Sequence, residues 1–600
     1  MTNFLIETDE QVEQALEVLE GKSLVGVDTE TTGLNPHKDK LVSIQFSDGV
    51  DGWFFPVAFE SGENISSESV DRVKGFLRKF QGAFAAYNAN YDVHIIQSNW
   101  GVKITVAHDP MIMMRILGYE SAALKFAARV VLGEQNVVEL KSFFAPDEEI
   151  AVAKMSPKLL LKYGCDDAIW TVRLIKPLHL SVDQQGLGGI YDLEIKYQRV
   201  LRDMEYRGMK VDISILISKS AEFLQNLERA KDDFWGIVDV RTESEFERVS
   251  LNSSKKVSAL LYDTLGYVCQ TYTAKTKSRS CSLEALALLE QDDLISKLVE
   301  IKSLENVYSH YLIRAGAYVQ EGRIRPDHSQ IGESGRPYTR NPNIQQWPNV
   351  CREAIFPDGG SYFILADYKA AELRLLTAMT GEPFFQKIFK DGVDPHISTM
   401  VAMTSLKKED IDKKQRTMGK ILNYGIIYGM EKYGLARRLL VNPDTAEKLL
   451  AKFNSVIPKV VEWKRKVEDE LEDTQRTTTM WGRSRTIPEI KSKHQPERDK
   501  AKRQAVNHRC QGGIADLMKI VSVELSQAFG NEWVEEASMR IVEEVHDSIL
   551  FQIGGDISPE EAIETIRPIM EKELNGVKME CDFAIGEVGE SWGSLNRSGE

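Results

Sequence analysis

Short apolar runs separated by turns dominate the first hundred residues and predict β-strands. The clearest runs cover residues 24–27, 41–49 and 52–59. The first of them continues directly into Asp28 and Glu30. Because alternate residues of a strand share one face, we expect these two carboxylates to point into the same site.

Two further acids follow on segments with a different periodicity. Asp92 lies in the segment NANYDVHII, directly after an apolar run at residues 84–87. Residues 162–174, KYGCDDAIWTVRL, have helical spacing and place Tyr163 and Asp167 one turn apart on one face. An ordered set of acids like this rarely arises by chance, so we interpret the four acids as one site.

Helical periodicity dominates residues 190–340. A polar, basic stretch without apolar spacing, residues 268–282, interrupts it and carries Lys275, Lys277 and Arg279. Cations on an exposed tip suit contacts with phosphates. An ordinary surface loop explains the same residue types equally well.

Residues 364–374, ILADYKAAELR, combine both kinds of pattern. A short apolar run ends at Asp367, and Leu373, Leu376 and Met379 then have helical spacing. An aspartate at a strand-to-helix turn often caps the helix. A carboxylate at the end of a buried strand can also be held rigidly while facing a cleft. This stretch alone leaves both interpretations open.

One predicted helix carries cations and aromatic residues together. Arg416, Lys420, Tyr424 and Tyr428 recur every four residues and therefore lie along one face. Two cations one turn apart suit a triphosphate, and an aromatic ring can stack on a base or sugar. A solvated amphipathic face is the alternative, but exposed faces seldom combine two tyrosines with two cations.

The C-terminal region predicts a basic helix and then a hairpin. Arg503, Asn507 and Gln511 recur every four residues on the helix. In the segment SMRIVEEVHDSILFQI, two apolar runs flank His546 and Asp547. This pattern predicts a β-hairpin with an acid at its tip.

Composition narrows the class of protein. The chain has 600 residues, too many for one core, so several domains are expected. Its hydrophobic content of 42% and charged content of 28% are typical of a soluble globular protein. The six cysteines are scattered without a CxxC pair, which favours neither disulfides nor zinc and fits a reducing intracellular setting. The N-terminus lacks a signal-peptide core, and no run approaches the roughly 18 apolar residues of a membrane span.

The formal net charge of −15 gives no sign of a nucleic-acid partner. Basic residues nevertheless cluster between positions 483 and 509, and local clusters matter more than the total. An acidic body with a basic cleft fits this distribution. A solvated charged helix fits as well, and charge alone favours it.

The N-terminal acids resemble the signatures of a known group, the 3′–5′ proofreading exonucleases of the DnaQ-like, ribonuclease H-like fold. The residues that match its DxE, NxxxD and YxxxD signatures are Asp28, Glu30, Asp92, Tyr163 and Asp167. The resemblance implies that the four acids hold two divalent metals that stabilise the attacking and leaving oxygens of phosphodiester hydrolysis. It also implies that Tyr163 orients the attacking water and that Asn88 lies near the substrate. A degenerate exonuclease is the alternative, and the presence of all four acids favours an active one.

The rest of the chain resembles the polymerase I family, the family A DNA polymerases. The stretches that carry this resemblance are SGRPYTRNPNIQQWP at 334–348, DYKAAELR at 367–374, DPHISTM at 394–400, RTMGKILNYGIIYG at 416–429, GRSRTIP at 482–488, VHDS at 545–548 and GEVGESWGSL at 586–595. Ser548 replaces the family's glutamate, and Lys369, Ala370 and Ala371 also depart from its pattern. The departure at position 548 leaves both metal-binding acids in place.

This second resemblance implies specific roles. Asp367 and Asp547 would hold two divalent cations, and Glu372 would exclude a ribose 2′-hydroxyl. The residues implied for nucleotide binding are Arg416, Lys420, Tyr424, Tyr428 and His396, with Lys420 also counted as catalytic. The residues implied or predicted for DNA contact are Arg336, Arg503, Asn507, Gln511, His546, Lys275 and Lys277. In the family, a tyrosine at position 424 can replace the hydrogen bond lost with the sugar 3′-hydroxyl, so little discrimination against dideoxynucleotides is expected.

The predicted architecture is an α/β multidomain protein. A ribonuclease H-like exonuclease domain is expected first, and a right-hand polymerase domain with a thumb, an antiparallel palm sheet and helical fingers is expected after it. The expected bounds are 1–185 for the exonuclease, 186–335 for the thumb and connecting helices, 336–405 for the first part of the palm, 406–475 for the fingers and 476–600 for the second part of the palm.

The expected activity is template-directed DNA synthesis from dNTPs with 3′–5′ proofreading. Carboxylate sites suit Mg²⁺, with two ions per active site, and Mn²⁺ is expected to substitute. The expected partners are primer–template DNA and dNTPs, for a monomer that does not bind membranes. Helicase, primase and clamp partners are not predicted.

A cellular setting also follows from the resemblance. Asp28 lies near the start of the chain, so no 5′-nuclease domain is expected. This compact layout resembles a phage or prophage replicative polymerase working in the host bacterial cytoplasm, and organellar relatives remain an alternative. Two competing hypotheses stay open at this point: an exonuclease fused to a non-catalytic nucleic-acid-binding palm, and a repair or lesion-bypass polymerase.

Overall fold

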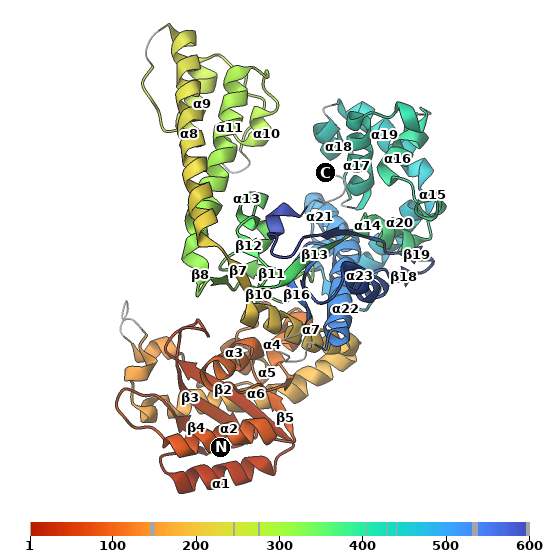
Figure 1. Ribbon diagram of the computed structural model, residues 1–600. Coiled ribbons are helices and arrows are strands. Elements are labelled where there is room, and N and C mark those ends of the chain that lie inside the picture. The colour runs from red at the N-terminus through yellow and green to blue at the C-terminus, as the bar shows by residue number, and fades with distance from the viewer. Residues whose placement is uncertain are drawn as a thin grey trace.

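The computed structural model shows three bodies arranged around a central sheet (Figure 1). The described residues are 2–144, 150–243, 246–273, 276–404, 406–427, 429–439, 441–530 and 538–595. Lys275 and Tyr428, two of the predicted contact residues, lie outside them. No helix in the described part of the chain combines the length and apolar character needed to cross a bilayer.

The N-terminal body is built on a six-stranded sheet in the order β1-β4-β3-β2-β5-β6. Its strands are β1 (Asn3–Leu5), β2 (Leu24–Thr31), β3 (Leu41–Ser47), β4 (Gly52–Pro56), β5 (Ala83–Ala85) and β6 (Val106–His108). The central strand β2 runs antiparallel to β3 and parallel to β5. The strands predicted from the apolar runs are therefore confirmed.

Alternation along β2 separates the core from the site. Val25 and Val27 point into the hydrophobic core beneath the first three helices. Those helices are α1 (Asp9–Glu20), α2 (Ser67–Lys79) and α3 (Ala89–Trp100). Asp28 and Glu30 occupy the opposite face, which α6 (Pro157–Gln184) covers. A methyl group at Gly26 would lie 2.7 Å from the Ala168 carbonyl oxygen, so this glycine permits the close approach of α6.

Three helices connect this sheet to the rest of the molecule. α4 (Pro110–Ile116) and α5 (Leu124–Val131) pack beside α6, and α7 (Gly188–Arg207) follows it. Leu201 and Met204 of α7 pack in the core of the central sheet. Helix α7 lies in the segment 186–335, predicted as the thumb and connecting helices, and it supports the central sheet.

A long helical projection follows α7 (Figure 1). The helices α8 (Ile213–Thr242) and α11 (Asp293–Val307) lie side by side. Phe234 and Leu298 belong to the separate core of this projection. Short elements complete it: α9 (Ser254–Ala259), α10 (Leu283–Leu286), α12 (Ile313–Ala315) and π-helical turns at Leu260–Thr264 and Tyr308–Leu312.

The central sheet has the order β16-β17-β13-β20, with β13 in the interior. Its strands are β13 (Ser361–Tyr368), β16 (Met539–Val545), β17 (Ser548–Gly554) and β20 (Cys581–Ile585). Ile364 and Ala366 face the core beneath α7, α22 (Gly513–Ala528) and α23 (Pro559–Met570). Phe363 and Leu365 face the opposite core. Asp367 continues this second, odd-numbered face.

Helices form a third body beside the sheet (Figure 1). They are α14 (Ala371–Thr380), α15 (Pro383–Lys390), α16 (Pro395–Thr404), α17 (Lys413–Ile427), α18 (Lys432–Leu439), α19 (Pro443–Val456) and α20 (Pro458–Thr474). They share a core of their own, to which Phe385 and Phe453 belong. α21 (Gln495–Asn507) returns the chain from this body to α22.

Small sheets and turns complete the fold. β7 (Met209–Val211), β8 (Val319–Gln320), β9 (Arg323–Ile324) and β12 (Ile355–Phe356) form one four-stranded sheet in the order β12-β7-β9-β8. The remaining pairs are β10 (Asp327–Ser329) with β11 (Tyr338–Arg340), β14 (Arg476–Thr478) with β15 (Ser484–Thr486), and β18 (Glu573–Leu574) with β19 (Val577–Lys578). A short helix, α13 (Asn349–Arg352), precedes β12.

Candidate active sites

The first candidate site lies between β2, α3 and α6, and we call it the four-acid site. It comprises Asp28, Glu30, Asp92 and Asp167. Glu30, Asp92 and Asp167 are each less than a tenth exposed. Thr29 Oγ1 donates a hydrogen bond of 2.7 Å to Asp92 Oδ1, which fixes α3 against the central strand.

Burial and mutual repulsion dominate the electrostatics of the four-acid site. Burial and the charges of Asp92 and Asp167 raise the pKa of Asp28 well above its ordinary value. Burial and the charge of Asp167 raise the pKa of Glu30 to about 8. Burial also raises the pKa of Asp92 to about 7 and that of Asp167 to about 6. The site therefore concentrates negative charge that the protein alone compensates poorly.

Two predicted partners of the acids lie beside them. Burial and the charge of Asp167 raise the pKa of Tyr163, and a hydrogen bond from Tyr163 limits the rise in the pKa of Asp167. Asn88 is the N-cap of α3 in a left-handed conformation, with φ of 63°. Its backbone N–H donates to Asp109 Oδ1 at 3.1 Å, which anchors the turn before Asp92.

The donor set of the four-acid site suits hard divalent cations. It offers only carboxylate oxygens, and two such cations would neutralise the repulsion that raises the pKa values. In the described part of the chain, however, no group of three or more His, Cys, Asp and Glu side chains is arranged to hold a metal as it stands. The carboxylates are thus gathered but not yet in a coordinating arrangement.

The second candidate site lies at the end of the central sheet, and we call it the two-acid site. Asp367 pairs in register with Ser548 across β13 and β17. The N–H of Tyr368 donates to the Asp547 carbonyl at 3.2 Å. The predicted hairpin is confirmed, because β16 and β17 are joined by His546 and Asp547 alone. Strand register therefore brings two acids together that are far apart in the sequence.

The capping interpretation of Asp367 is wrong. Helix α14 has Ala370 as its N-cap, in a left-handed conformation with φ of 51°. Asp367 belongs to β13 and ends its odd-numbered face. The carboxylate is therefore presented by the strand rather than used by the helix.

Glu372 lies in the first turn of α14 and is 7% exposed. Arg336 Nη2 lies 3.3 Å from Glu372 Oε1 in an ion pair. The buried Nε of Arg336 has no hydrogen-bond partner among the described residues. The pair joins the loop before β11 to the helix that follows Asp367.

The cationic face of α17 is present in the structure. Lys420 is exposed, and Arg416 Nε pairs with Asp394 at 2.9 Å. Tyr424, one turn further on, is half-buried. The prediction for Tyr428 falls outside the described residues, so the described face consists of the other three side chains.

His396 lies differently from the phosphate-contact prediction. Its side chain is only 6% exposed, its Nδ1 lies 3.0 Å from Asn423 Nδ2, and its ring centroid is 5.8 Å from that of Tyr424. Burial lowers its pKa to about 4, so the ring is neutral. His396 is therefore packed between α16 and α17 as a neutral ring, and its contact with phosphate stays a prediction.

Comparison with known proteins identifies the family. The profile of DNA polymerase family A matches residues 215–594, and a 3′–5′ exonuclease profile matches residues 3–183. The chain belongs to DNA polymerase family A. Domains of these families generally use divalent metals. The family and the α/β multidomain fold expected from the sequence are confirmed.

Several family A enzymes can be compared with the whole chain. DNA polymerase I of Pseudomonas aeruginosa is 26% identical over 588 residues, which cover 92% of this chain and 62% of that protein. DNA polymerase I of Chloroflexus aurantiacus is 26% identical over 594 residues, which cover 95% of this chain and 61% of that protein. The chain thus spans about three fifths of the length of these relatives.

A solved family A structure has the same fold. The polymerase domain of Pol1 from M. smegmatis, in complex with DNA primer-template and dNTP, superposes with a TM-score of 0.83. The two chains are 21% identical, and the match covers 98% of each. The predicted palm, fingers and thumb correspond to the central sheet, the helical body beside it and the long projection, and their predicted residue bounds stay predictions.

The predicted DNA contacts lie along the palm and thumb. Arg503 pairs with Glu431 of the fingers at 3.2 Å, and Asn507 Nδ2 donates to Gln511 Oε1 at 3.2 Å. A π-helical turn, His508–Gly512, follows α21 and contains Gln511. His546 is exposed at the hairpin tip, with φ of 60°.

At the thumb tip, Lys277 is exposed. Arg279, by contrast, forms a double ion pair with Asp263 at 2.6 Å. The basic tip predicted from composition is thus partly neutralised within the thumb. Lys275 lies outside the described residues.

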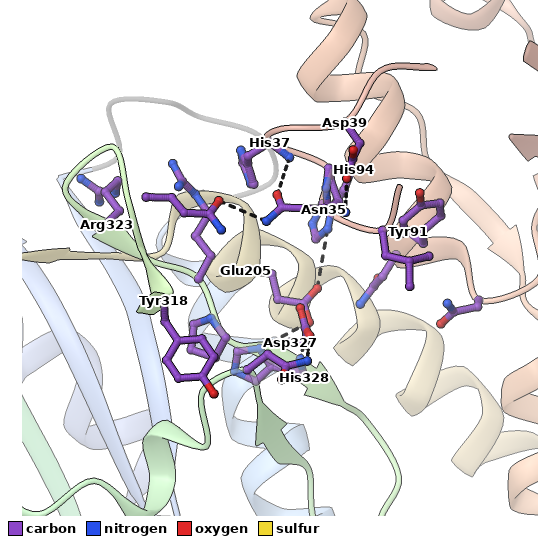
Figure 2. Close-up of a pocket in the computed structure, with 18 residues that line it drawn as sticks. Asn35, His37, Asp39, Tyr91, His94, Glu205, Tyr318, Arg323, Asp327 and His328 are labelled. Carbon is purple, nitrogen blue, oxygen red and sulfur yellow. Dashed lines mark hydrogen bonds and ion pairs between the residues drawn. The ribbon is translucent and has the colours of Figure 1, made fainter. Parts of the chain in front are cut away.

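A cavity of about 610 Å³ lies where the exonuclease domain meets the polymerase domain. Figure 2 shows Glu205 between His94 of the exonuclease domain and His328 of the palm region. Glu205 Oε2 is 3.7 Å from His94 Nδ1, and Glu205 Oε1 is 3.4 Å from His328 Nδ1. Burial alone would lower the pKa of His328, but Glu543 and Glu205 raise it well above its ordinary value.

The cavity is also lined by residues next to the four-acid site. Asn88 and Tyr91, which precede Asp92 in the sequence, line it. Arg325 also lines it, and its buried Nη1 has no hydrogen-bond partner among the described residues. The cavity is therefore lined both by the N-terminal domain and by the segment 318–341.

Sequence reasoning missed two charged residues beside the acids. Lys125 of α5 forms an ion pair with Asp167, and no motif marks it. Asp582 of β20 lies opposite Asp367 in register and pairs with Lys369 at 2.7 Å. Lys369 is one of the departures from the family pattern, and this partner accounts for it structurally.

Proposed function

We propose that this chain synthesises DNA from dNTPs on a template and removes mispaired primer ends with its own 3′–5′ exonuclease. One observation carries the proposal. Strand register brings Asp367 beside the Asp547 turn at the end of the central sheet. Helix α14, which follows Asp367, packs against α17, whose described face carries Arg416, Lys420 and Tyr424. Two carboxylates together with cations and an aromatic ring suit a nucleoside triphosphate and a primer end.

In the polymerase site, Asp367 and Asp547 would hold two Mg²⁺ ions. When bound, such ions activate the primer 3′-hydroxyl and neutralise charge on the triphosphate. Arg416 and Lys420 would bind the phosphates, and Tyr424 would pack against the sugar and nascent pair. These roles rest on the geometry and on the family resemblance together.

A second pair of residues, Glu372 and Arg336, would select the sugar and contact the primer. Glu372 would exclude a ribose 2′-hydroxyl, because its ion pair with Arg336 holds the carboxylate in one position. Arg336 would also contact the minor groove of the primer end. Arg503, Asn507, Gln511, His546 and the thumb-tip lysines would contact the template and backbone.

In the exonuclease site, Asp28, Glu30, Asp92 and Asp167 would hold the second pair of Mg²⁺ ions. Tyr163 would orient the attacking water, and Asn88 would contact the strand being cut. The cavity beside Asn88 would receive the frayed primer end, with Arg325 near its backbone phosphates. Both reactions would then act on the same primer strand.

The partners we infer are primer–template DNA and dNTPs, the same kinds of molecule that the M. smegmatis complex contains. We place the reaction in the cytoplasm of a bacterial cell. The finer role we favour is replication of a phage or prophage genome. Primer extension on a long primed single strand with a competitor trap tests this role, since a replicative enzyme extends far per binding event.

Variants of each acid site test the two activities separately. Asp367→Ala or Asp547→Ala should lower primer extension by at least about a thousandfold and leave excision intact. Asp28→Ala with Glu30→Ala should do the reverse. Each variant is the control for the other, because neither set of substitutions is expected to change the fold or the binding of DNA. Extension that persists in Asp367→Ala would refute the polymerase assignment.

A further inference from the structure

One lysine enters the four-acid site from outside its motifs. Lys125 lies on α5, a short helix that packs on α6. Its Nζ forms an ion pair with Asp167, and the side chains of both residues are nearly buried, at 12% and 9% exposure. Because a buried lysine is unfavourable unless it is paired, the site is built to hold this cation.

The lysine is enclosed by one face of α6. Its Nζ lies 4.2 Å from the ring centroid of Tyr163 and 4.9 Å from that of Trp170. Tyr163, Asp167 and Trp170 follow one another at helical spacing, so a carboxylate and two aromatic faces form a cage. One wall of the cage is the tyrosine proposed to orient the attacking water.

The charge of Lys125 reaches the other acids as well. Burial raises the pKa values of Asp28, Glu30 and Asp167, and Lys125 opposes the rise in each of them. Asp167 is therefore engaged by a protein cation in the arrangement that is not yet ready to hold a metal. Lys125 and a metal ion would compete for the same carboxylate.

The charge balance indicates what Lys125 does once metals are bound. Two divalent cations would neutralise the four carboxylates. The net charge of the site would then be a single positive charge, contributed by Lys125. This charge matches the single negative charge of a phosphodiester. An amine that has released Asp167 remains within the site and can donate to that phosphate.

A purely structural ion pair is the alternative, and the same helix offers one for comparison. Lys162 pairs with Asp166 one turn along α6, and the lysine side chain is 62% exposed. That pair lies within one helix and outside the cage. Lys125 instead joins two helices and is enclosed by site residues, which a surface pair does not explain.

We propose that Lys125 is a phosphate-contacting residue of the exonuclease and the resting counterion of Asp167. The proposal rests on the 3′–5′ exonuclease function proposed above. Before metals bind, the lysine neutralises Asp167. With the carboxylates holding metals, the ammonium of Lys125 would be released from Asp167 and would donate to the scissile phosphate. Removal of the charge should therefore strengthen metal binding and weaken excision, two effects of opposite sign.

The experiment compares Lys125→Met, Lys125→Arg and Lys162→Met, each combined with Asp367→Ala and Asp547→Ala so that only the exonuclease site is left to bind metal. Mn²⁺ binding without DNA is measured by calorimetry. Excision of a mispaired primer end is measured in single turnovers at saturating Mn²⁺. Thermal melting without metal checks that each variant is folded.

We expect Lys125→Met to bind Mn²⁺ at least about threefold more tightly and to excise at least about thirtyfold more slowly. Lys125→Arg should keep most of the excision, and Lys162→Met should change neither quantity by more than about twofold. Unchanged metal affinity, or weaker metal binding together with normal excision, would overturn the proposal. If the parent does not excise at all, the exonuclease assignment fails, whereas the Mn²⁺ titration still tests the competition for Asp167.

Discussion

The two acid sites of this chain place their carboxylates in opposite environments. The four-acid site is enclosed between a sheet and α6, and three of its four acids are buried. The two-acid site lies at the end of an open antiparallel sheet, with Asp547 on a partly exposed two-residue turn. The first concentrates repulsion inside a packed domain, whereas the second leaves its acids in contact with solvent.

The sites also differ in how their parts are packed. All four acids of the four-acid site belong to one domain. The acids of the two-acid site lie on β13 and on the hairpin turn of the palm sheet, whereas Arg416 and Lys420 lie on α17 of the fingers, which has its own core. Helix α14 joins the two cores, since Leu375 packs with the palm and Leu373 with the fingers. The helix proposed to bind phosphates therefore belongs to a different packing unit from the acids.

The largest predicted difference is in pH dependence. The raised pKa values of Glu30, Asp92 and Asp167, about 8, 7 and 6, mean that the folded domain binds more protons than the unfolded chain between about pH 4 and 8. Without metal, the stability that these groups contribute is present below about pH 4 and is lost as the pH rises through 6 to 8. With Asp28→Asn and Glu30→Gln, the stability lost between low and high pH should be smaller by at least about 2 kcal/mol. Hydrogen exchange of the β2 amides in EDTA, at pH 5 and pH 8, measures it.

The polymerase acids supply the matched control for this prediction. Asp367→Asn with Asp547→Asn should leave the pH dependence of β2 exchange unchanged, because these acids lie in another packing unit. Addition of Mg²⁺ at pH 8 should slow the exchange in the parent and not in Asp28→Asn with Glu30→Gln. If the exchange rates of the β2 amides depend on pH in the same way in the parent and in that variant, burial of charge does not distinguish the two sites.

The next effect concerns sugar selection. Glu372→Ala removes the carboxylate proposed to block a 2′-hydroxyl and also leaves Arg336 without its ion-pair partner. We expect discrimination against ribonucleotides to fall roughly 10- to 100-fold. Steady-state incorporation of a ribonucleotide and its deoxy counterpart measures the ratio. Arg336→Gln should lower the discrimination ratio less, because the carboxylate of Glu372 would still be present and only its ion pair would be lost. Full discrimination in Glu372→Ala would contradict the assignment.

Much of both sites could be predicted from the sequence, because chain-local patterns determine it. The DxE spacing on β2 and the hairpin around Asp547 follow from alternation along strands. The place of Lys125 could not be predicted, since it depends on how α5 packs on α6. The burial of His396 depends in the same way on Asn423 of a neighbouring helix. Local periodicity shows which residues share a face, and only packing shows what that face meets.

A smaller effect is expected at Tyr424. Its ring is half-buried and lies 5.8 Å from that of His396. If its hydroxyl replaces the hydrogen bond of the missing sugar 3′-hydroxyl, Tyr424→Phe should increase discrimination against dideoxynucleotides about 5- to 10-fold, the value of one hydrogen bond. Competition between a dideoxynucleotide and its deoxy counterpart measures the change. His396→Ala is the control for loss of ring support, and it should slow incorporation of both nucleotides alike.

The smallest effect tests a backbone feature that both sites share. Asn88 and Ala370 are the N-caps of α3 and α14, with φ of 63° and 51°. Asparagine tolerates this left-handed conformation, whereas alanine loses about 1 kcal/mol in it. Ala370→Gly should therefore stabilise the palm by about 0.5 kcal/mol, since the greater freedom of glycine in the unfolded chain offsets part of the gain. Asn88→Gly should change stability less, and urea unfolding of both variants measures the difference. If Ala370→Gly is destabilising, the strain at this turn is not what distinguishes the polymerase site from the exonuclease site.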